Sequence, residues 1–80
     1  MYNTNQSLLA TVHEGEEVDA LYRDLETGEV FAVELKAEPA DTWGDFTIRC
    51  AVIARENFET PRLIGFFNPA EVERMGIDVY

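Results

Sequence analysis

The side chains of this sequence that could do chemistry are mostly carboxylates, and they are concentrated in one stretch. Residues 14–29 contain seven acidic residues and a single basic one, Arg23. The acidic residues are Glu14, Glu16, Glu17, Asp19, Asp24, Glu26 and Glu29. On a strand, residues i and i+2 share a face about 6.6 Å apart, so Glu17 and Asp19 are predicted to form a carboxylate row. Because Arg and Lys bind carboxylates as they bind phosphates, such a row can occupy a phosphate site.

Other chemistries are poorly supported by the sequence. Residues 24–29 superficially resemble a calcium loop, but an EF-hand needs Gly at the sixth position and Glu at the twelfth, where this chain has Glu29 and Leu35. His13 is the only histidine, so no histidine cluster can bind a metal. Cys50 lies in an apolar run without a neighbouring histidine and is expected to be a buried small hydrophobe. We therefore predict no catalytic residue, no metal and no cofactor, and a protein that is not an enzyme.

The net charge is unevenly distributed along the chain. The 80 residues include 16 acidic and 6 basic ones, which gives a formal charge of −10, and residues 1–45 carry −9 of it. Direct binding to nucleic acid or to an anionic membrane is disfavoured, because both need Lys and Arg. Two explanations of the acidic half remain open. It keeps a small β-rich protein soluble, or it forms a binding face for a basic groove.

Alternation of apolar and polar residues predicts a β-rich fold. The predicted strands cover residues 7–13, 17–23, 29–36, 45–55 and 62–67. A turn over Asp24–Gly28 joins the second and third strands, since Gly28 can adopt a positive φ. Residues 18–25 also fit helical spacing, with Val18, Leu21, Tyr22 and Leu25 on one side. A hairpin is preferred because the segment is short and a turn follows at once.

The segment 45–55 is predicted to be the central strand. Phe46, Ile48, Cys50 and Val52 alternate with other residues, and the apolar run at its end suggests burial on both faces. Residues 37–44 before it are expected to form a loop. Trp43 in that loop is either a core residue or an exposed interface anchor.

One short helix is predicted after the last of these strands. Asn68 suits the N-cap, Pro69 the first helical position, Glu71 a capping box and Gly76 the C-terminal cap. Residues 77–80 are expected to add an edge strand or to dock on the sheet. The prediction is thus one α+β domain over residues 1–80, an antiparallel β meander of about five strands with one short C-terminal helix.

The sequence also favours a cytoplasmic monomer. A single cysteine allows no intrachain disulfide, which small secreted domains usually need. The apolar runs reach only about five residues, far below the roughly 20 that span a bilayer. The first residues lack the basic residues and apolar core of a signal peptide. We expect no membrane contact.

The acidic stretch from Glu14 to Glu29 in a hairpin, in a chain ending Gly76-Ile77-Asp78-Val79-Tyr80, resembles the small acidic anti-CRISPR proteins encoded by phages. Some type I inhibitors of this kind mimic DNA and block the DNA site of a Cascade-type complex. The resemblance implies a non-enzymatic inhibitor in the cytoplasm of a bacterial host, and as its partner a basic surface of the Cascade large subunit. The expected partner-binding residues are Glu14, Glu16, Glu17, Asp19, Asp24, Glu26, Glu29 and Glu34.

A protein of a different class would use the same charge. An intracellular adaptor or immunity-type protein would bind a basic partner protein without displacing DNA. Competition with added DNA separates the two hypotheses, because DNA lowers binding only for a mimic.

Overall fold

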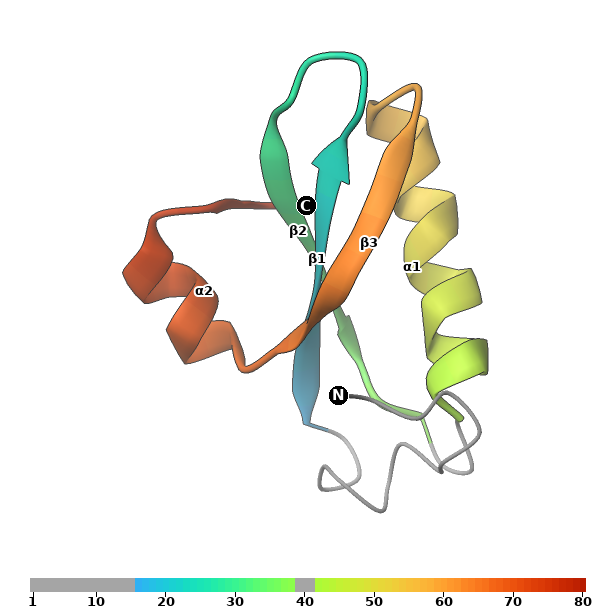
Figure 1. Cartoon of the computed structure of the whole chain (residues 1–80). Helices are drawn as coiled ribbons and strands as arrows, with labels where there is room; N and C mark the ends of the chain where they lie inside the picture. The colour runs from blue at the N-terminus through green and yellow to red at the C-terminus, as the bar shows by residue number, and fades with distance from the viewer. Residues whose placement is uncertain (1–15, 39–41) are drawn as a thin grey trace.

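The structure, a computed structural model, describes residues 16–38 and 42–80 as a sheet with a helix on each face (Figure 1). The α+β class is confirmed. The sheet contains four strands in the order β3-β1-β2-β4. The elements in chain order are β1 (Glu17–Asp24), β2 (Val30–Lys36), α1 (Trp43–Asn57), β3 (Pro61–Phe67), α2 (Pro69–Met75) and β4 (Asp78–Val79).

The predicted hairpin is confirmed. β1 and β2 pair antiparallel from Glu17 opposite Lys36 to Arg23 opposite Val30, and the turn between them contains Gly28 at φ 76°. The alternative helix over residues 18–25 is wrong. Tyr22 packs in the core under α1, whereas Leu21 packs with Val72 of α2. Neighbouring residues thus serve opposite faces, as only a strand between two layers allows.

The predicted central strand over residues 45–55 is wrong, because this segment lies in helix α1. Thr42 caps the helix: its side chain accepts from the Asp45 N–H at 3.1 Å, and its own N–H donates to the Asp45 carboxylate at 3.3 Å. These reciprocal bonds form a capping box. The helix buries Phe46, Cys50 and Ala54, one turn apart, against the sheet. Trp43 begins α1, and the role predicted for its side chain lies outside what the structure describes.

The sheet is mixed rather than an antiparallel meander. β1 takes the central position, pairing antiparallel with β2 on one side and with β3 on the other. β4 pairs parallel with β2, because α2 carries the chain across to the far edge before it returns. Both edges of β1 are therefore paired. The predicted strand over residues 7–13 lies outside the described residues.

The end of the chain follows most of its sequence signals. The predicted strand 62–67 corresponds to β3, and Asn68 caps α2 by accepting the Ala70 N–H at 2.9 Å. The capping box predicted with Glu71 is wrong, because the Glu71 N–H donates to the Asn68 carbonyl at 2.9 Å and not to its side chain. Gly76 ends α2 in the left-handed region at φ 70°. β4 then forms the predicted edge strand.

Candidate functional site

The eight residues predicted to bind a partner do not form one row. The hairpin has an open end, where β1 begins and β2 ends, and a turn end about 23 Å away. Exposed or half-buried residues of the predicted set lie at both ends. Glu16, Glu17 and Glu34 belong to the open end, and Glu26 and Glu29 to the turn end. Asp19 and Asp24 are buried, and Glu14 lies outside the described residues.

Asp24 has a structural role in the turn end. One of its carboxylate oxygens accepts from the N–H and the hydroxyl of Thr27 at 3.0 and 3.1 Å, and the other accepts from the Thr60 N–H at 3.0 Å. Burial alone would raise the pKa of Asp24, but these hydrogen bonds outweigh it and lower the pKa. Asp24 therefore holds the β1–β2 turn to the α1–β3 connection and is not available to a partner.

This connection adds two acidic residues that the sequence argument missed. Helix α1 runs antiparallel to β2 and ends beside the turn (Figure 1), where the Leu25 N–H donates to the Thr60 carbonyl at 3.0 Å. Glu56 in the last turn of α1 and Glu59 in the connection are both exposed. Because residues 45–55 were predicted to form a strand, the sequence did not predict that Glu56 and Glu59 lie beside the β1–β2 turn.

Three arginines reduce the charge of the turn end. Arg23 of β1 lies directly opposite Arg62 of β3, and Arg55 lines the same shallow depression as Arg62, with a volume of about 450 Å³. In the described part of the chain, four exposed glutamates and the buried Asp24 thus stand beside three arginines, a formal charge of −2. The turn end is only weakly acidic.

The open end is more strongly acidic. Its described acidic residues, apart from the buried Asp19, are Glu16, Glu17, Glu34, Glu38 and Asp45. Two basic residues accompany them. Lys36 lies opposite Glu17, and Arg49 reaches Glu38 at 3.8 Å and the Lys36 carbonyl at 3.3 Å. Among the described residues, the open end therefore carries the larger excess of negative charge.

A carboxyl cluster lies on one sheet face at this end. Asp19 is 0 % exposed and has Glu34 directly opposite on β2, with Glu17 two residues away on β1. Neither carboxylate oxygen of Asp19 receives a hydrogen bond within the described chain when all three groups are ionised. We call Glu17, Asp19 and Glu34 the carboxyl cluster.

The carboxyl groups of the carboxyl cluster hold their protons more tightly than isolated carboxyl groups do. Burial raises the pKa of Asp19, and the negative charge of Glu17 raises it further, although a hydrogen bond from protonated Glu34 opposes this. The pKa of Glu34 is raised because it donates to Asp19, and that of Glu17 because it donates to Glu34. The cluster thus loses negative charge on acidification before isolated carboxylates do.

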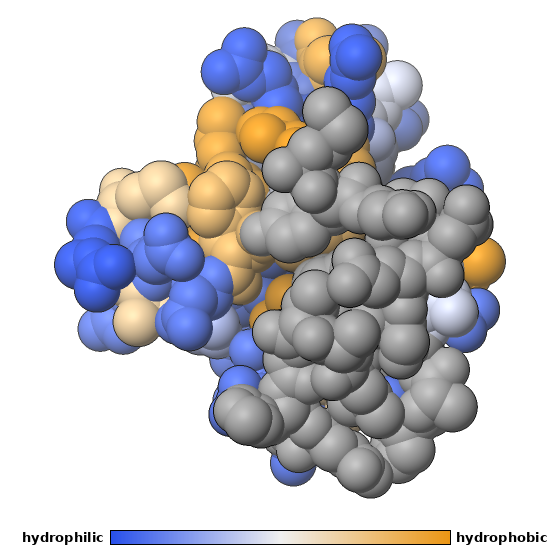
Figure 2. Space-filling model, turned by 60° about the horizontal axis from the view of Figure 1, so that its bottom comes forward, coloured by the Kyte–Doolittle hydropathy of each residue, from blue (hydrophilic) through white to orange (hydrophobic). Residues whose placement is uncertain are grey.

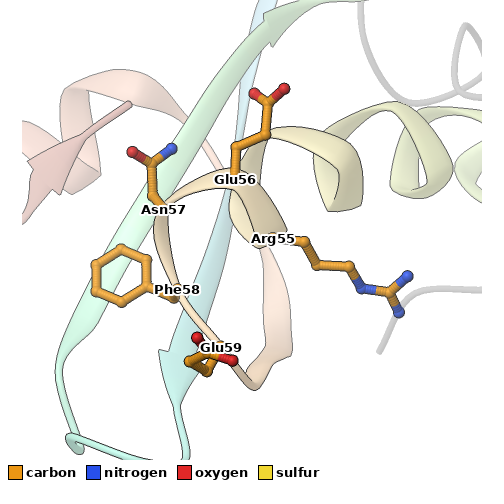
Figure 3. A pocket seen from close by; sticks show the side chains of 5 residues that line it. All are labelled: Arg55, Glu56, Asn57, Phe58 and Glu59. Carbon is orange, nitrogen blue, oxygen red and sulfur yellow. The ribbon is translucent and has the colours of Figure 1, made fainter.

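A depression of about 190 Å³ at the end of α1 does not gather reactive groups. Its side chains, those of Arg55, Glu56, Asn57, Phe58 and Glu59, point in different directions (Figure 3). Within residues 16–38 and 42–80, no three His, Cys, Asp or Glu side chains are placed to hold a metal ion.

Cys50 is fully buried, as the sequence predicted. It faces Tyr22, whose pKa is raised to about 12 by burial and by the nearby Cys50 thiol, against the opposing charge of Arg55. The Tyr22 hydroxyl has no hydrogen-bond partner within the described chain. Tyr22 is therefore neutral at ordinary pH, and the pair belongs to the core.

The described surface combines polar and apolar areas. Figure 2 is turned so that the lower part of Figure 1 comes forward, and its coloured residues include a hydrophobic area with hydrophilic side chains at its margins. Among the described helices, neither is long and apolar enough to cross a membrane. Among the described residues, the candidate site is thus an exposed acidic surface at the open end of the hairpin.

The fold and the site define a small acidic α+β protein whose hairpin has one strongly acidic and one weakly acidic end. Comparison with known proteins adds no family to this description. No protein-family model, no curated protein and no solved structure matches the chain.

Proposed function

We propose that this protein is a non-enzymatic inhibitor that binds a basic, nucleic-acid-binding surface of another protein through the open end of its hairpin. The observation that carries the proposal is the charge imbalance at that end, where the exposed Glu16 adjoins the carboxyl cluster, whose own member Glu17 is also exposed. A basic groove supplies the Arg and Lys that these carboxylates lack in their own chain. The resemblance described above makes the DNA site of a type I CRISPR effector the first partner to test.

The open end is favoured over the turn end for a physical reason. Long-range attraction to a basic groove depends on the local excess of negative charge, and Arg23, Arg55 and Arg62 reduce that excess at the turn end. The free energy gained by releasing counterions falls as the salt concentration rises, and so does the long-range attraction between the two charged surfaces. We therefore expect the affinity to fall as ionic strength rises.

Neutralising the open end should weaken binding much more than the same change at the turn end. The open-end variant is Glu16→Gln with Glu17→Gln, and its matched control is Glu26→Gln with Glu29→Gln. All four residues are exposed, and each variant removes two negative charges. We expect a Kd about tenfold or more higher for the open-end variant and about threefold or less for the control.

The measurement is the displacement of target DNA from a purified Cascade-type complex by each variant, with circular dichroism to confirm folding. Equal losses for the two variants would contradict the placement of the site at the open end. Full inhibition by both variants would contradict the proposal that the acidic side chains drive binding. Binding that added DNA does not reduce would identify the adaptor class instead.

A further inference from the structure

The outer side of α1 carries an apolar pair that the fold does not use. Ile48 is 68 % exposed and Val52 is 57 % exposed, and the two lie one helical turn apart. The opposite side of the helix buries Phe46, Cys50 and Ala54 in the core. The helix is therefore apolar on two sides, and only one of them meets the sheet (Figure 1).

Two exposed charged residues extend this pair into a stripe. Asp45 stands three residues before Ile48, and Arg55 stands three residues after Val52. Spacings of three, four and three residues keep all four side chains on one side of a helix, as in the seam of a coiled coil. We call Asp45, Ile48, Val52 and Arg55 the outer stripe.

The order of residues in the outer stripe is self-complementary. Asp45 and Arg55 are equally far from position 50, and so are Ile48 and Val52. In two antiparallel helices related by a two-fold axis at this level, Ile48 of each copy meets Val52 of the other. Asp45 of each copy then lies beside Arg55 of the other. Such an isologous contact closes on itself.

We propose that the outer stripe is the interface of a homodimer, with α1 of two copies packed antiparallel. The charges on α1 favour a second copy over other occupants. The chain as a whole carries −10, but α1 contains two acidic and two basic residues and is neutral. An acidic or a basic partner would leave Asp45 or Arg55 beside a like charge, whereas a second copy satisfies both. Arg55 forms no ion pair with the described part of its own chain.

The interface is small, and the dimer is accordingly weak. One 15-residue helix on each side offers less than the roughly 1,200 Å² of a standard stable interface. The sequence favoured a monomer. That prediction assumed that Ile48 and Val52 lie in a buried strand, whereas both are exposed on helix α1. The proposal does not rest on the proposed function, because Glu16 and Glu17 lie outside the outer stripe, although both surfaces include Asp45.

Sedimentation equilibrium at about 0.15 M salt tests the dimer, since charge repulsion is then screened beyond about 8 Å. We expect reversible dimerisation between about 10 μM and 1 mM chain. Ile48→Lys should raise the dissociation constant about tenfold or more. Its matched control is Ile64→Lys, at a 51 % exposed isoleucine on β3, which should change it by less than about threefold. Both variants change the net charge of the chain equally, from −10 to −9, so general repulsion cannot explain a difference.

A second pair of variants tests the charges of the stripe. Arg55→Glu should weaken the dimer, whereas Arg62→Glu, the same change at an exposed arginine outside the stripe, should not. Circular dichroism confirms folding of each variant. A wild-type chain that stays monomeric up to about 1 mM, or equal effects within either matched pair, would overturn the proposal. The Glu16→Gln, Glu17→Gln variant should dimerise as the wild type does. Its dimerisation would show that the dimer does not depend on the binding surface of the proposed function.

Discussion

Replacing Phe46 with alanine should lower the free energy of unfolding by about 3–5 kcal/mol, as expected for a large side chain lost from a packed core. Phe46 is fully buried, and its ring lies 5.9 Å from that of Phe66, centroid to centroid. A chain of 80 residues is stabilised by only about 4–12 kcal/mol. The variant should therefore unfold at a much lower urea concentration than the wild type when unfolding is followed by circular dichroism.

Ile48→Ala is the matched control for this prediction. Ile48 is two residues away and largely exposed on α1, so its truncation should change stability by no more than about 0.5 kcal/mol. In a strand, residues 46 and 48 would share one face and both truncations would be costly. Comparable losses from Phe46→Ala and Ile48→Ala would contradict the helix.

These two residues also show why the largest error in the sequence prediction occurred. Phe46, Ile48, Cys50 and Val52 alternate as in a strand, but Phe46 and Cys50 with Ala54 equally follow the helical period. Short apolar runs of β-branched residues do not separate the two periods. The deciding signal was the capping box between Thr42 and Asp45. The sequence prediction divided this pair, because Thr42 lay in the predicted loop and Asp45 began the predicted strand.

Local signals were enough where they pointed to a single structure. The β1–β2 hairpin follows from alternation on both sides of Gly28, and α2 follows from Asn68-Pro69 at its start and Gly76 at its end. The position of β4 parallel to β2 could not be predicted, because it depends on the path of the chain around the sheet.

The acidic surface could be predicted only in part, because burial of a charged residue depends on long-range contacts. Glu16 and Glu17 are exposed as expected. Asp19 and Asp24 belong to the same run, yet both are buried under neighbouring elements. Counting acidic residues along the chain cannot distinguish a binding carboxylate from a structural one.

The second large effect is expected at Asp24. Asp24→Asn should lower the melting temperature at pH 7 by about 5 °C or more, because the amide nitrogen cannot accept the hydrogen bonds that one carboxylate oxygen receives from Thr27. The folded-state pKa of Asp24 is lowered, so its contribution to stability is present above its unfolded pKa of about 3.8 and is lost as pH falls through the folded pKa. The difference between wild type and variant should therefore shrink in acid.

Asp19→Asn provides the opposite test on the same strand. The folded-state pKa of Asp19 is raised, so its ionisation destabilises the fold: stability is greatest below the unfolded pKa of about 3.8 and is lost as pH rises through the folded pKa. An asparagine there stays neutral and can donate to Glu34. We expect Asp19→Asn to raise the melting temperature at pH 7 and to have little effect near pH 3.

Thermal unfolding of both variants between pH 3 and pH 7 decides whether these two buried aspartates differ as the geometry requires. The melting temperature of the wild type minus that of Asp24→Asn should grow as pH rises. The melting temperature of the wild type minus that of Asp19→Asn should become increasingly negative over the same range. A loss of stability at pH 7 in both variants would show that Asp19 has a stabilising hydrogen-bond donor. In that case Asp19 would be a second structural carboxylate like Asp24, and the raised proton affinity of the carboxyl cluster would be refuted.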